Sequence, residues 1–133
     1  MAVLDAIKAI QDAMLTVSGI RTAPDYPSDG DLPAVITHLA TGTITPGYAS
    51  AGVNLELHNI VVELHVSDSG NLAASFEQLE TLHALVVAEL LSDVTFGGTL
   101  ANYQTLTYST TRTSWAGKPT LARVYTLNNS KIL

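Results

Sequence analysis

The chain has 133 residues, 47% of them hydrophobic, a formal net charge of −6 and no cysteine. These values predict one packed domain, residues 1–133, and exclude a chain that is disordered throughout. The lack of cysteine excludes disulfides, thiolate metal ligands and a cysteine nucleophile.

The first predicted element is a helix near the start of the chain. Apolar residues recur at spacings of three and four between Val3 and Val17, and Gly19 follows as a cap. The start of the chain lacks the basic residues of a signal peptide. No apolar run reaches the ~18–20 residues that a membrane span needs. We therefore expect synthesis in the cytoplasm and no membrane partner.

The segment 21–33 is predicted to be a turn-rich connecting loop, because it holds three prolines, a glycine and three aspartates. The aspartates Asp25, Asp29 and Asp31 resemble a calcium loop only superficially. The twelve-residue spacing and the terminal glutamate of an EF-hand are missing, so we expect no calcium site.

Two strands are predicted next, at residues 32–39 and 54–67, with an uncharged segment between them. The intervening residues 41–52 are small and include three glycines, so we expect a protruding, mobile loop at about 41–53. Ile44, Pro46 and Tyr48 are its apolar members. We predict that these three form a partner-binding loop.

The tripeptide Glu-Leu-His occurs twice in the second strand, at 56–58 and 63–65. On a helix, Glu56, His58, Glu63 and His65 would share one face and approach a metal site. The β-branched run 60–62 favours a strand instead, and an odd spacing of seven then places the two units on opposite faces. We interpret each as a local pair on a solvated face and predict no metal site.

A second helix is predicted from Leu72 to Leu90, with Asn71 as its N-cap. His83 falls on its apolar stripe, and we interpret it as a hydrogen-bonded core residue rather than a ligand.

After two consecutive glycines, residues 103–113 and 120–127 predict two further strands rich in Thr, Tyr and Val. Trp115 lies at the turn between them, where it either covers the sheet edge or anchors an interface. The tail 128–133 is predicted to be loosely held.

Charge is unevenly distributed along the chain. All twelve acidic residues lie between Asp5 and Asp93, whereas the last forty residues carry only basic ones, Arg112, Lys118, Arg123 and Lys131. Four scattered cations in a negative protein do not favour tight nucleic-acid binding. The asymmetry is either chance or a means for the basic part of one copy to meet the acidic part of another in a head-to-tail ring. Trp115, Arg112, Lys118 and Arg123 are the candidate interface residues.

Recognisable catalytic motifs are absent from the sequence. It has no glycine-rich phosphate loop, Gly-x-Ser-x-Gly elbow, H-E-x-x-H or paired-carboxylate signature. We therefore expect a protein that is not an enzyme, with no catalytic residue and no cofactor. The competing class is a small α+β enzyme or ligand-binding domain with Glu56, His58 and His65 near a pocket, because triads are defined by geometry and not by spacing.

The order of predicted elements is α-β-β-α-β-β. We expect an α+β fold with a mostly antiparallel sheet of about four strands and two helices packed on one face. This order resembles the tail terminator proteins of long-tailed bacteriophages, the family of lambda's minor tail protein U. The resemblance is carried by Leu32–Val35 after an acidic loop, Glu56–His58 opening the second strand, and the end strand Leu121–Leu127 after Trp115. It spans almost the whole chain, and head–tail joining and tail completion proteins have similar arrangements.

The resemblance implies a structural protein of the virion. Tail terminators form a homohexameric ring that caps the tail tube, stops its polymerisation and joins the tail to the head. The implied partners are further copies of this chain, the tail tube protein and a head completion or connector protein. The implied place is the head–tail junction of a virion, after synthesis in the host cytoplasm. DNA would pass through the ring without specific binding.

Overall fold

The computed structural model describes residues 2–23, 31–48, 53–68, 70–115 and 117–132. The described residues form two helices and five strands in the order α-β-β-α-β-β-β. The helices are α1, Ala2–Leu15, and α2, Leu72–Ser92. The strands are β1, Ala34–Tyr48, β2, Val53–Ser67, β3, Leu100–Asn102, β4, Thr105–Trp115, and β5, Lys118–Ile132.

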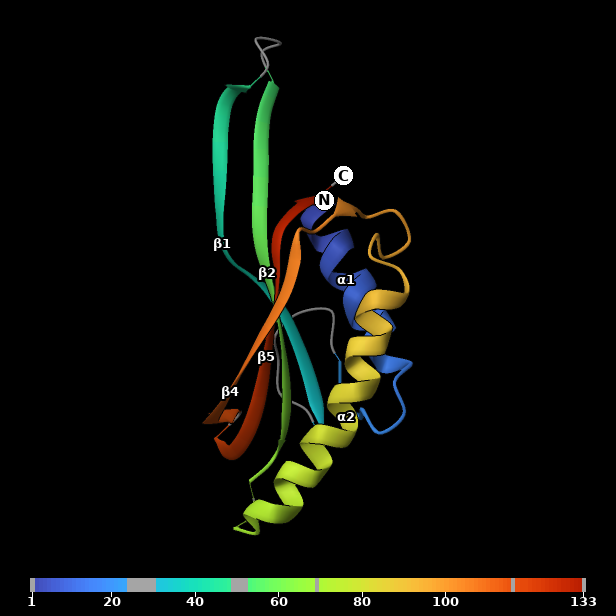
Figure 1. Ribbon diagram of the computed structural model, residues 1–133, viewed down its shortest axis with the longest axis vertical. Coiled ribbons are helices and arrows are strands. Elements are labelled where there is room, and N and C mark those ends of the chain that lie inside the picture. The colour runs from blue at the N-terminus through green and yellow to red at the C-terminus, as the bar shows by residue number, and fades with distance from the viewer. Residues whose placement is uncertain (1, 24–30, 49–52, 69, 116, 133) are drawn as a thin grey trace.

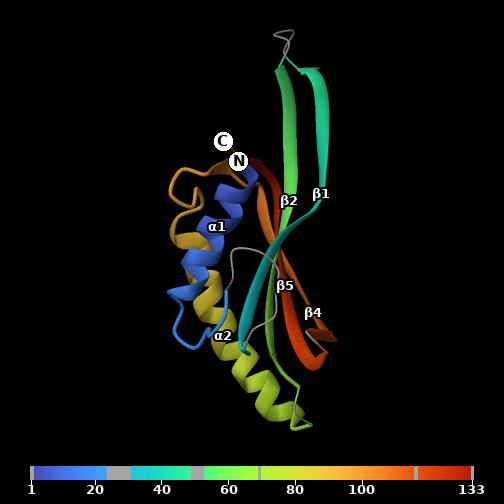
Figure 2. The same ribbon diagram turned by 180° about the vertical axis from the view of Figure 1, so that it is seen from behind.

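The strands form one curled antiparallel sheet in which β2 and β5 are central. β1 pairs with the outer side of β2, and β4 and β3 pair with different parts of the outer side of β5. Figures 1 and 2 show both helices on the same side of this sheet. The expectation of an α+β fold with about four strands is wrong. The molecule is mainly a sheet, about half of the chain being strand, although the order of elements matches the predicted order broadly.

Two features of the sequence account for this difference. The residues after Gly97 and Gly98 form the short strand β3, which pairs with the end of β5. The predicted loop is also largely strand, because β1 continues to Tyr48 and stays paired with β2 as far as Val53. The prediction of an unstructured loop is therefore wrong for residues 41–48, and residues 49–52 lie outside the described part of the chain. Alternating threonines supply β-branched side chains that suit a strand without adding charge.

The predicted loose tail is also wrong where it is described, at residues 128–132. Asn129 adopts a φ of 54°, and its N–H donates to Asn59 Oδ1 at 3.1 Å. Ser130 is fully buried and donates to the Leu127 carbonyl at 2.9 Å. The tail is the last part of β5. A β-bulge opposite residues 58–60 interrupts its pairing with β2, and the pairing resumes at Ser130.

The core lies between the helices and the face of the sheet that they cover. Alternate residues of β2 point into it, and apolar residues at helical spacing on α1 and α2 meet them. Its fully buried members include Ile10, Met14, Ile60, Val62, Leu64, Leu79, Val86, Leu90, Leu121 and Leu127.

Polar contacts at the edges of this core fix the helices relative to the sheet. Gln11 of α1 is buried, donates to the Val35 carbonyl at 2.7 Å and accepts from the Thr37 hydroxyl at 2.6 Å. The predicted N-cap of α2 is confirmed, since Asn71 Oδ1 accepts from the Ala74 N–H at 3.2 Å.

Candidate functional site

The most distinctive feature of the molecule is a two-stranded arm. β5 pairs with β2 from Ser67 to His58, and beyond that point β1 and β2 are paired only with each other among the described residues. We call residues 41–48 and 53–58 the arm. Figure 1 shows it extending well beyond the helices and the rest of the sheet.

Strand alternation gives the arm two chemically different faces. Thr43 lies opposite Leu57 and Thr45 opposite Leu55, so one face carries threonines and half-buried leucines. The other carries Ile44 opposite Glu56, which is the one Asp, Glu, Lys or Arg among the residues of the arm.

The predicted partner-binding residues lie on this arm. The side chain of Ile44 is 61% exposed, and Pro46 is exposed near a break in the strand register. The side chain of Tyr48 lies outside the described residues. Ile44 is the most exposed of the large apolar residues in the described part of the chain, although single exposed apolar side chains are common on protein surfaces.

The first Glu-Leu-His unit shapes the same arm. The ring of His58 lies over Gly42, where an added Cβ would be 2.8 Å from His58 Nδ1 and 2.9 Å from the Leu57 carbonyl oxygen. His58 Nε2 is 3.7 Å from Glu56 Oε2, at an exposed carboxylate. The predicted local pair of Glu56 and His58 is therefore present. Because Gly42 has no side chain, the ring of His58 fits over it.

The second Glu-Leu-His unit belongs to a hydrogen-bonded network on the sheet face that α1 and α2 leave uncovered. Glu63 Oε2 is 2.7 Å from His38 Nε2, and Glu63 Oε1 is 3.1 Å from His65 Nε2. His65 Nδ1 is 2.9 Å from Thr120 Oγ1. Its ring stacks on Trp115 with centroids 5.9 Å apart. The hydrogen bond to His65, followed by that to His38, lowers the pKa of the Glu63 carboxyl to about 2 against the opposing effect of burial.

The prediction of a solvated surface pair is therefore wrong for Glu63 and His65, because the side chain of His65 is only 3% exposed. His38 was not predicted as a member of this network. It lies opposite Val61 in the β1–β2 ladder, and only this non-local register places it beside Glu63. No spacing within the sequence carries that information.

This network does not form a usable catalytic arrangement. Hydrogen bonds connect a hydroxyl to an imidazole and the imidazole to a carboxylate, through Thr120, His65 and Glu63. Nucleophile triads connect their groups in this order. The Thr120 hydroxyl is fully buried, so a substrate does not reach it. No cluster of three or more His, Asp or Glu side chains suited to a metal ion occurs within the described ranges. Two hollows beside the helices, of about 370 and 330 Å³, are lined by other residues than Glu56, His58 and His65.

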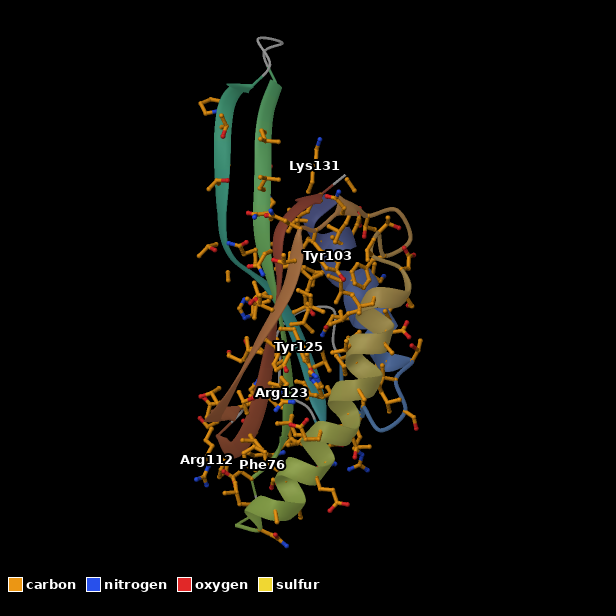
Figure 3. All side chains as sticks on the ribbon, viewed as in Figure 1. Phe76, Tyr103, Arg112, Arg123, Tyr125 and Lys131 are labelled. Carbon is orange, nitrogen blue, oxygen red and sulfur yellow. The ribbon has the colours of Figure 1, made fainter. Side chains whose placement is uncertain are left out.

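The four predicted interface residues do not gather in one patch. Arg123 is buried on the helix side, where it pairs with Glu80 Oε1 at 2.6 Å and lies over the Tyr108 ring. Trp115 faces the opposite side, against His65. Arg112 is 65% exposed, binds Asp68 at 3.0 Å and lies at the end of the sheet opposite the arm (Figure 3). Lys118 is exposed at the start of β5.

His83 is hydrogen-bonded, as interpreted, but it is only partly buried and does not belong to the core. Its Nδ1 is 2.7 Å from the Tyr125 hydroxyl, and its ring meets Tyr108 edge-on at 4.8 Å. Figure 3 shows Tyr125 and Arg123 between α2 and the sheet. Burial, followed by the charge of Arg123, lowers the pKa of His83 and so favours the neutral imidazole.

Comparison with known proteins gives no family. No protein-family model matches this chain, and no curated protein is similar enough to count as a relative. None of the described helices combines the length and the hydrophobicity needed to cross a bilayer.

Proposed function

We propose that this protein is a structural subunit of a bacteriophage neck, a tail terminator that forms a ring on the end of the tail tube. In this role the ring stops tube polymerisation and presents a surface for the head. The resemblance in element order and short motifs motivates the proposal. The other neck proteins, which join the head to the tail or complete the tail, remain the alternatives within the same class.

The observation that carries the proposal is the arm. A two-stranded ribbon on its own is only marginally stable in water, and this one exposes Ile44 far from any core. A partner that covers the arm offsets the cost of keeping it ordered.

The charges of the molecule support the same role. The body is negative overall, and the arm carries a single charged residue, Glu56. A negative subunit repels the DNA backbone, so DNA can slide through a ring of such subunits without sticking.

The arm provides the test, in the virus that encodes this chain. Ile44→Ser removes the exposed apolar contact and leaves the core untouched. We expect a folded protein that no longer caps tails, seen by electron microscopy as overlong or headless tails. Thr43→Ser, a neighbouring change on the other face of the arm, is the matched control. Infectious particles with tails of uniform length from Ile44→Ser would contradict the proposal.

A further inference from the structure

Parts of the two outer strands of the sheet lack the features that normally protect a sheet edge. Exposed edges usually carry lysines, inward-pointing charges or a covering segment, because their free N–H and C=O groups otherwise recruit another strand. β1 contains no Asp, Glu, Lys or Arg. Its proline, Pro46, and its two register shifts lie outside residues 41–45, so this stretch of the arm is an unprotected edge. β4 contains only one charged residue, Arg112. Beyond the bridge between Thr22 and Ala34, no strand of the described chain pairs with the outer side of β1 or of β4.

The two edges are compatible in direction. Every neighbouring pair along the path β1-β2-β5-β4 is antiparallel, so β1 and β4 of one molecule run in opposite directions. When a second copy in the same orientation is placed beside the first and shifted along the strands to the level of the arm, its β4 therefore lies antiparallel to the first copy's β1. The sheet continues from copy to copy without a change in its pattern.

The side chains of the two edges also match. In the arm, Thr41 and Thr43 lie opposite Asn59 and Leu57, and therefore on the uncovered face of the sheet, as does the neighbouring Thr45. The same face of β4 carries hydroxyls at every second position, at Thr107, Ser109, Thr111 and Thr113. All seven side chains are exposed. Paired strands place side chains of one face next to each other, and threonines form favourable cross-strand pairs.

We propose that the β1 edge of the arm pairs with β4 of a second copy of this chain, head to tail. The inference rests on the self-association in the proposed function and specifies the strands that make it. Pairing about a two-fold axis, β1 with β1 or β4 with β4, joins one kind of edge and leaves the other free in the dimer. Head-to-tail pairing uses both the β1 edge of the arm and the β4 edge of every copy in a ring.

Disulfide trapping tests this pairing. The chain has no cysteine, so every cross-link must come from the introduced residues. Thr43→Cys is combined in turn with Thr107→Cys, Ser109→Cys or Thr111→Cys, which scan the register. Each purified protein is oxidised over a range of concentrations and run on a non-reducing gel. Oxidation traps even a weak association. We expect at least one double variant to give a ladder of dimers, trimers and larger species, several-fold more abundant than from any single variant.

The control positions separate edge pairing from random collision. Glu77→Cys is exposed on α2, away from both edges, and combined with Thr43→Cys it is expected to give no ladder. Dimers formed equally well by the single-cysteine variants would show two-fold pairing and overturn the inference. So would the absence of cross-links from all double variants. Neither result bears on tail length in the Ile44→Ser virus, so a failure here is distinct from a failure of the proposed function.

Discussion

At the scale of single residues, Tyr125 shows how the sheet and α2 are joined by a polar contact inside an apolar layer. It is fully buried, and burial raises its pKa well above the usual range, so it remains a phenol, and its hydroxyl is hydrogen-bonded to His83 Nδ1. Tyr125→Phe removes this hydroxyl and leaves His83 Nδ1 without that partner. We expect a loss of about 1–2 kcal/mol in the free energy of unfolding, measured with urea. Tyr108→Phe, at a 58% exposed tyrosine, is the control and should change little.

The Glu63 carboxylate makes the stability of the protein depend on pH in acid. Its pKa is about 2 in the folded protein, against an ordinary value of 4.5 for a glutamate in the unfolded chain, so the ionised form favours folding. This contribution is complete above pH 4.5 and is lost as the pH falls towards 2, at most about 3 kcal/mol. We expect the free energy of unfolding of the parent to fall more steeply over that window than that of Glu63→Gln. Parallel curves for the two proteins would refute the assignment.

At the scale of elements, the arm depends on one glycine. Gly42→Ala brings a Cβ to within 3 Å of the His58 ring and of the Leu57 carbonyl, and the backbone oxygen cannot rotate away. We expect disrupted pairing of β1 with β2 in the arm while the body stays folded, at a cost of roughly 1–3 kcal/mol. Hydrogen exchange of the arm amides measures it. Thr41→Ala, one residue away, is the control and should keep its protected amides.

At the scale of the whole molecule, the free edges of β1 and β4 predict weak self-association in isolation. The purified protein should be monomeric or only weakly associated, and a ring should form where the tail tube ends. Light scattering at rising protein concentration measures this. A tight two-fold dimer that persists at low concentration would count against it.

Much of the local structure was predictable from the sequence, whereas the long-range pairing was not. The second strand was predicted within one residue of β2, and Asn71 was identified as the cap of α2. β1 was predicted to end at Leu39 because uncharged small residues resemble a loop, yet a partner strand extends it to Tyr48. The joining of His38 to Glu63 and the burial of Arg123 both depend on cross-strand register, which local periodicity does not contain.

The position of β5 beside β2 has a consequence for the kinetics of folding. β1 and β2 form a local hairpin, a step that takes about 1–10 μs in simple hairpins. β2 and β5 are separated in the sequence by α2, β3 and β4. Pairs such as Ser67 with Thr120 therefore form only after a long loop has closed. A chain dominated by such distant pairings refolds on the scale of milliseconds to seconds. During synthesis, the edge of β2 that later pairs with β5 therefore stays unpaired until β5 has been made. A chaperone that binds exposed strand edges would protect the chain from aggregation in this period.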